Sequence, residues 1–260
     1  PPASPVPDPL PPAEAAACRT LLEKLGGLPL ALEQARAFME TLNETLAKYL
    51  DLFTRAELDM LSRRALGSTN YPDSVATTWN VSIKMLSGPA RVMLRIAGIL
   101  APTPIPLTFF ESDTDLLGRL AGEQFPGVRS GSTSSLPGLF VRDIAAELSA
   151  YSLARPAPGT IRFHALLQAV ERHCTPTQHA NATRDAAWSL LRGSAPESSF
   201  NFEGWTGWAA LERHARELIE REEGDSQRCA WAMDAIGGYV SRALGRAAEA
   251  EPLYEEALAM

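Results

Sequence analysis

The chain has 260 residues, a formal net charge of −7 at pH 7 and a hydrophobic content of 45%. Its length allows two or three small domains with buried cores, while its negative charge argues against a broad nucleic-acid-binding surface. No run of 18 apolar residues and no charged-then-apolar leader occurs, so the sequence predicts neither a membrane span nor a signal peptide.

The cysteines and basic residues indicate the cellular setting. Cys18, Cys174 and Cys229 are odd in number and far apart, which predicts free thiols in a reducing cytoplasm. Only three of the 24 basic residues are lysines, and alanine and proline are plentiful, a composition typical of a GC-rich bacterial genome. The first residue is proline rather than methionine, so we expect the chain to be a piece of a longer protein.

Residues 1–12 form the first segment, with the sequence PPASPVPDPLPP. Its seven prolines exclude a helix or a central strand. The segment is therefore predicted to be an extended, Pro-rich linker.

A helical domain is predicted for residues 13–66. The apolar spacing indicates helices near residues 13–25, 29–41, 43–50 and 55–64. One apolar stripe runs along the second of these helices and beyond it, through Leu28, Leu32, Ala35, Met39, Leu42 and Leu46. Pro29 suits the first helical turn, where its missing N–H costs nothing, and Gly27 lets another group approach the backbone. The loop 67–73 then marks a domain boundary.

A second domain is predicted for residues 75–175. Ser87 is a candidate cap for a helix with Pro89 in its first turn. An extended break is imposed by Pro102, Pro104 and Pro106. The helices expected here lie near residues 90–100, 107–110, 114–122, 139–151 and 164–174. Because residues 152–163 have the pattern of a β-hairpin, the segment is predicted to be a winged-helix domain.

The remaining chain is predicted to be helical in two parts. A helical bridge covers residues 178–223, with helices near 181–191 and 208–222 around a loop. Residues 226–260 form a helix pair, near 230–244 and 245–258. In the bridge, apolar packing is the expected role of Trp205, Trp208 and Leu211. In the final helix, Pro252 is expected to cause a bend or a local break.

The residues Gly27-Leu28-Pro29-Leu30-Ala31-Leu32 resemble the GLPLAL motif of NB-ARC proteins, which belong to the STAND class of signal-transducing nucleotide switches. In that family the motif opens a helix of the small helical ARC domain, and its proline packs near the adenine of bound ADP or ATP. The resemblance implies that Pro29 contacts the adenine and that Gly27 allows the approach.

The residues Phe163-His164-Ala165-Leu166 resemble the MHD motif of the same family. That resemblance implies that His164 reaches the β-phosphate of ADP and holds the closed state, since an imidazole N–H donates to a phosphate oxygen. Ala165 departs from the motif, which has Asp at this position. Apart from the resemblance, a histidine at the start of a helix is a cap or a partly buried polar residue.

The resemblance extends over most of the chain. Residues 75–175 resemble the second ARC domain of TPR-bearing NB-ARC proteins, Trp205–Ala215 their bridge helices, and Gly245–Leu258 the second helix of a TPR unit. The implied fold is mainly α, with an ARC-type helical bundle, a winged helix with a short β-hairpin, a helical bridge and a TPR-like pair. The implied function is the nucleotide-sensing, autoinhibitory portion of a STAND-type ATPase switch with a TPR sensor.

The implied partners are a nucleotide-binding domain that precedes the chain, a downstream TPR array, and a protein or small-molecule signal. Neither a membrane nor nucleic acid is an expected partner. ADP or ATP with Mg²⁺ is expected only in the full-length parent, which the resemblance implies is an ATPase switch.

The chain itself lacks a Walker A loop. None of the three lysines, Lys24, Lys48 and Lys84, follows Gly or precedes Ser or Thr. Phosphoryl transfer depends on that lysine, so the chain alone is not expected to be an enzyme. A zinc site formed by His173, Cys174 and His179 is not predicted either, because no fourth ligand is evident.

Two other functions fit the same residues. One is a TPR-type protein–protein interaction scaffold whose upstream helices only extend the core. The other, weaker hypothesis is a winged-helix regulator that binds DNA. The expected reading helix, 139–151, offers Arg142 but also Asp143 and Glu147, whereas a DNA-binding face needs to be positive.

Overall fold

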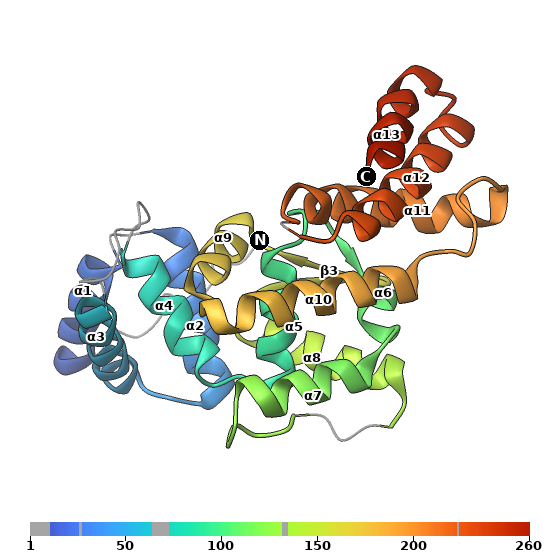
Figure 1. Ribbon diagram of the computed structural model, residues 1–260. Helices are drawn as coiled ribbons and strands as arrows, with labels where there is room; N and C mark the ends of the chain where they lie inside the picture. The colour runs from blue at the N-terminus through green and yellow to red at the C-terminus, as the bar shows by residue number, and fades with distance from the viewer. Residues whose placement is uncertain (1–10, 26–27, 64–72, 132–134, 223) are drawn as a thin grey trace, which may run out of the picture. The chain divides into compact units, whose positions relative to one another are not determined.

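The computed structural model describes residues 11–25, 28–63, 73–131, 135–222 and 224–260 (Figure 1). These residues form thirteen helices and three short strands, so the prediction of a mainly α chain is confirmed. None of the described helices combines the length and apolar character needed to cross a bilayer. The chain divides into two compact units, residues 1–85 with Ala150–Ser152, and residues 86–149 with 153–260.

The described residues of the first unit form four helices: α1 (Pro12–Lys24), α2 (Pro29–Leu42), α3 (Leu46–Arg63) and α4 (Asp73–Ile83). An aromatic cluster lies at its centre, where the ring centroid of Tyr49 is 5.2 Å from that of Phe38 and 6.4 Å from that of Phe53. All three rings are fully buried. Such pairs stabilise a core beyond the area that they bury.

The buried face of α2 differs from the predicted stripe. Of the stripe residues only Ala35 is buried, and the face that packs into the core is centred on Ala31, Ala35 and Phe38. Two alanines let the backbone approach its neighbours closely, which leaves room for the large Phe38 ring. Asn43 ends the helix in the left-handed conformation (φ 50°), so Leu46 belongs to the next helix.

Helix α3 is continuous, whereas two separate helices were predicted here, near 43–50 and 55–64. No glycine or proline interrupts Leu46–Arg63, so nothing ends the helix between them. The predicted loop 67–73 lies almost entirely outside the described residues, as do residues 1–10 of the predicted linker.

The second unit contains the remaining elements. They are α5 (Gly88–Gly98), β1 (Ile105–Pro106), α6 (Leu107–Glu111), α7 (Thr114–Gln124), α8 (Pro137–Ala150, whose last residue belongs to the first unit), β2 (Ala154–Ala157), β3 (Thr160–Phe163), α9 (Ala165–Cys174), α10 (Thr177–Ser194), α11 (Phe202–Glu220), α12 (Ser226–Arg242) and α13 (Ala247–Ala259). Helix α5 lies at the core and packs against α7 and α9. Its start was predicted correctly: Ser87 accepts a hydrogen bond from the Ala90 amide, and Pro89 lies in the first turn.

A three-stranded antiparallel sheet with the order β1-β3-β2 accompanies these helices. The predicted hairpin is confirmed as β2 and β3, joined at Pro158-Gly159, where Gly159 has φ 71°. Strand β1 was not predicted. It pairs Ile105 with Ile161 at an edge of the sheet. Pro106 has no N–H to donate, and it is tolerated there because the outer side of an edge strand pairs with no further strand.

Helices α11 to α13 correct the predicted helix ends. Helix α11 begins at Phe202 rather than near 208, so Gly204 and Gly207 lie inside it. Helix α12 begins at Ser226 rather than near 230, and α13 continues through Pro252, which does not break it. The domain boundaries proposed at the level of sequence remain predictions.

Candidate functional site

The start of α2 carries the first predicted site. Pro29 is the first residue of the helix and is exposed, and Leu28 before it provides no side-chain cap. The first amides of the helix therefore lack a capping acceptor from that side chain. Gly27 lies outside the described residues.

Gln34 lies in the same motif region and is buried. Its Nε2 donates a hydrogen bond to the carbonyl oxygen of Ser152, a residue of the same unit that has φ 50°. One face of α2 is therefore held by a side-chain to main-chain bond, which the apolar pattern did not indicate.

His164 is the N-cap of α9 and directly follows β3. Its ring is exposed, and its Nδ1 accepts a hydrogen bond of 3.2 Å from the Leu166 amide. A neutral imidazole that accepts at Nδ1 carries its proton on Nε2. The cap interpretation of the histidine is thus confirmed, and the same hydrogen bond fixes Nε2 as the donor of the ring.

Helix α9, which His164 opens, is anchored on α5. The Nε2 of Gln168 donates to the carbonyl of Ala97 at 2.6 Å, and the guanidinium of Arg172 donates to that of Gly98 at 2.8 Å. Both acceptors lie at the C-terminal end of α5, where carbonyls lack helical partners. This anchoring fixes the position of His164 within the second unit.

Two arginines lie beside His164 on the hairpin. Arg155 of β2 pairs directly with Arg162 of β3, and both side chains are exposed. His164 has extended backbone and lies two residues after Arg162, so these two side chains point to the same side of the chain. The hairpin therefore carries two positive charges opposite each other on adjacent strands. Alternation along β3 could have placed Arg162 and His164 on one side of the chain from the sequence.

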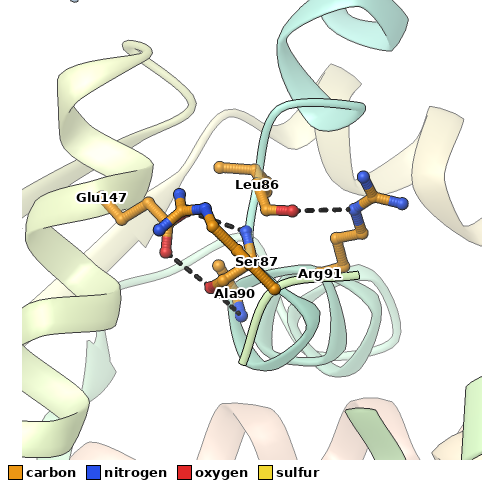
Figure 2. A network of polar contacts seen from close by, with 6 residues as sticks. Leu86, Ser87, Ala90, Arg91 and Glu147 are labelled. Carbon is orange, nitrogen blue, oxygen red and sulfur yellow. Dashed lines mark hydrogen bonds and ion pairs between the residues drawn. The ribbon is translucent and has the colours of Figure 1, made fainter. Parts of the chain in front are cut away.

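A polar cluster holds the start of α5 (Figure 2). The Glu147 carboxylate of α8 accepts hydrogen bonds from the Ser87 amide at 2.8 Å and from the Ser87 hydroxyl at 2.6 Å. The guanidinium of Arg129 forms an ion pair with the same carboxylate, and Arg91 Nε donates to the Leu86 carbonyl at 3.1 Å. The Glu147 carboxylate therefore stabilises the start of α5. It is engaged within the protein and is not one of the charges that α8 presents to a binding partner.

A buried ion pair links α5 to α9. Arg95 Nε lies 3.6 Å from a Glu171 carboxylate oxygen, and each side chain is 11% exposed. The Arg95 guanidinium also lies 4.2 Å from the centroid of the Phe125 ring and donates to Gln124 at 2.7 Å. Burial raises the pKa of Glu171 despite the nearby arginines, because a charged carboxylate is costly in an apolar surrounding.

His214 of α11 is completely buried next to the segment that enters β1. Its Nε2 lies 3.1 Å from the Pro104 carbonyl oxygen and 3.5 Å from the Thr103 hydroxyl. Its Nδ1 has no hydrogen-bond partner among the described residues. Burial lowers the pKa of His214, opposed by the Pro104 carbonyl and by Glu217.

The described residues contain no group of three or more His, Cys, Asp or Glu side chains arranged to bind a metal ion. His173 and Cys174 end α9, and His179 lies in the first turn of α10. All three cysteines of the chain are free, as predicted.

The predicted site residues are distributed over both units. Pro29 belongs to the first and His164 to the second, so the structure describes each only within its own unit. Within the second unit, Arg162 lies opposite Arg155 in the hairpin and two residues before His164.

Comparisons of the chain with protein-family models, with curated proteins and with solved structures found no match. A function for this chain therefore rests on its own residues.

Proposed function

We propose that this chain is the nucleotide-sensing, autoinhibitory part of a STAND-type ATPase switch that acts in the cytoplasm of a bacterium. The observation that carries the proposal is the placement of His164. Its ring is exposed at a strand–helix junction with Nε2 as the donor, which suits a contact to a phosphate oxygen. Arg162 on the same side of the chain adds positive charge for a phosphate.

The order of elements supports the proposal. In the second unit α5, β1, α6, α7, α8, β2 and β3 follow one another, and we interpret them as a winged-helix domain with β2–β3 as the wing. The GLPLAL-like helix α2 precedes these elements in the chain, and helices α10 to α13 follow them. We interpret α12 and α13, which pack on each other extensively, as a TPR-like pair that leads to a sensor.

In this function the chain itself performs no phosphoryl transfer. We propose that a nucleotide-binding domain that precedes the chain holds the phosphates and Mg²⁺ of ADP or ATP. Pro29 would contact the adenine, and His164 would contact the β-phosphate. Because a ligand shifts a two-state equilibrium only by its differential contacts, these two residues would favour the ADP-bound arrangement.

The test uses the product of the natural gene, with whatever precedes and follows these 260 residues. His164→Asn keeps a capping oxygen but removes the imidazole, whereas His164→Ala removes both. We expect both variants to bind ADP about ten-fold to a hundred-fold more weakly in calorimetry, the loss of one hydrogen bond to a charged group. His173→Ala, at an exposed histidine of the same helix, is the matched control.

If His164→Asn binds ADP as tightly as the unmodified protein does, His164 is a cap and nothing more. Absence of ADP or ATP binding in the unmodified protein would favour the second candidate, a TPR-type interaction scaffold. That candidate is favoured by the exposed side chains of Leu244, in the turn between α12 and α13, and Leu258, in α13, which are 40% and 88% exposed.

A further inference from the structure

Three aromatic side chains lie exposed or partly exposed around the start of α11. Phe200 is 48% exposed, Phe202 is 79% exposed, and Trp205 is partly exposed. The rings of Phe202 and Trp205 meet edge to face with centroids 5.6 Å apart. We call Phe200, Phe202 and Trp205 the aromatic patch. Such a cluster is costly to leave in water and is typical of a binding surface.

The loop that carries Phe200 is held by contacts at three glycines. A Cβ on Gly204 would lie 1.7 Å from the Ser198 carbonyl oxygen, and one on Gly207 would lie 2.4 Å from Cγ of Pro196. A Cβ on Gly238 of α12 would lie 2.4 Å from the Ser199 hydroxyl and 3.0 Å from the Phe200 ring. The loop therefore packs directly on the backbones of α11 and α12, and the aromatic patch rests on a pre-organised support.

Carboxylates accompany the aromatic patch. Glu197 lies in the same loop, Glu203 lies between Phe202 and Trp205 in the sequence, and both are exposed. Asp234 is exposed one turn before Gly238 on α12, and Arg242 is exposed one turn after it. The segment 195–207, which carries the aromatic patch, has no charged residue other than Glu197 and Glu203, so its own charge is −2, while Asp234 and Arg242 offset each other.

We propose that the aromatic patch binds a basic, Arg- or Lys-bearing segment of a partner protein. Aromatic faces attract guanidinium and ammonium groups, and the neighbouring carboxylates Glu197 and Glu203 complement their charge. This surface shares no residue with the nucleotide contacts proposed above, and its function does not depend on them.

Other occupants fit the aromatic patch less well. Nucleic-acid phosphates would be repelled by the carboxylates. A second copy of the chain that docked through the same surface would bring two negatively charged segments into one interface, which is unfavourable. Charge complementarity therefore favours a cationic peptide.

The test is selection of peptides from a random displayed library on the 260-residue chain, followed by fluorescence polarisation with the selected peptides. We expect the selected peptides to be enriched in Arg or Lys and to bind Phe202→Ser about ten-fold more weakly. Leu139→Ser is the matched control, because it also removes an exposed apolar side chain but lies in α8. Circular dichroism checks that each variant is folded.

The charge requirement is tested with Glu197→Gln and Glu203→Gln. Each is expected to weaken binding about two-fold to five-fold and to reduce its salt dependence. The proposal is overturned if the selection yields no binder, if the peptides lack basic residues, or if they bind Phe202→Ser unchanged. It is also overturned if sedimentation shows a dimer that Phe202→Ser dissociates, because the occupant is then a second copy.

Discussion

The ring of Tyr254 in α13 lies against the backbone of Gly237 in α12. A Cβ added to Gly237 would come within 2.7 Å of Cε1 and 2.9 Å of Cζ of that ring. Glycine at this position therefore permits close packing of the final helix pair, at the cost of a residue that weakens helices. We predict that Gly237→Ala lowers the free energy of unfolding by about 1–3 kcal/mol through overpacking, despite the higher helix propensity of alanine. Urea denaturation measures the change.

Gly118 in α7 is the control for this prediction, because no heavy atom lies within 4 Å of its added Cβ. Gly118→Ala should stabilise the chain by about 0.5–1 kcal/mol, the difference in helix propensity. Equal effects of the two substitutions would mean that Tyr254 moves aside without cost. In that case glycine is not required at position 237 for the packing of α12 on α13, and the prediction is wrong.

Ser87 caps α5 and also holds the Glu147 carboxylate of α8. Its hydroxyl accepts from the Ala90 amide and donates to Glu147, and the residue is fully buried. We predict that Ser87→Ala costs about 2–3 kcal/mol in urea denaturation, the sum of a lost cap and of a Glu147 carboxylate oxygen, Oε2, that loses its hydrogen-bond donor. Asp113, which caps α7 by accepting from the Leu116 amide, is the control. Asp113→Ala should cost only about 1 kcal/mol, and a similar cost for Ser87→Ala would show that Glu147 contributes nothing.

Local signals allowed part of this fold to be predicted. Ser87 and Pro89 mark the start of α5, and Pro158-Gly159 marks the hairpin, because capping and turn chemistry depend on adjacent residues. The place of His164 at the start of α9 was predictable for the same reason. The pairing of Arg162 with Arg155, in contrast, follows only once the strand register is known.

Contacts between distant residues account for what was missed. Strand β1 exists because Ile105 pairs with Ile161, 56 positions later, and two residues carry no periodicity of their own. Gly204 lies inside α11, where the Ser198 carbonyl occupies the place that a side chain would take. From the sequence alone, a glycine at this point is typical of a loop. The partner of Ser87 is Glu147, 60 residues away, and no local pattern indicates that pair.

His214 should make the stability of the chain depend on pH. Burial lowers its pKa in the folded state, so between that pKa and the usual value of about 6.5 the unfolded state binds more protons. Stability from this group is present above pH 6.5 and is lost as the pH falls. We predict that the melting temperature decreases from pH 7 to pH 5 and that His214→Gln removes much of this decrease. His173→Gln, at an exposed histidine, should leave the decrease unchanged, and a decrease that persists in His214→Gln would contradict the assignment.

The ion pair between Arg95 and Glu171 should be costly to break and inexpensive to replace. Arg95→Met leaves a buried carboxylate without its partner, which we expect to cost about 3–5 kcal/mol near pH 7. Burial already raises the pKa of Glu171, and loss of Arg95 removes a charge that lowers it. In this variant the folded state therefore takes up a proton more readily than the unfolded state, and stability is recovered as the pH falls. Urea denaturation at pH 5 and pH 7 measures the recovery relative to the unmodified chain.

The double variant Arg95→Met with Glu171→Leu should regain most of the loss at pH 7, because neither charge of the pair remains. A double variant as unstable as Arg95→Met alone would place the loss in the packing of Arg95 on Phe125 instead of in the charge.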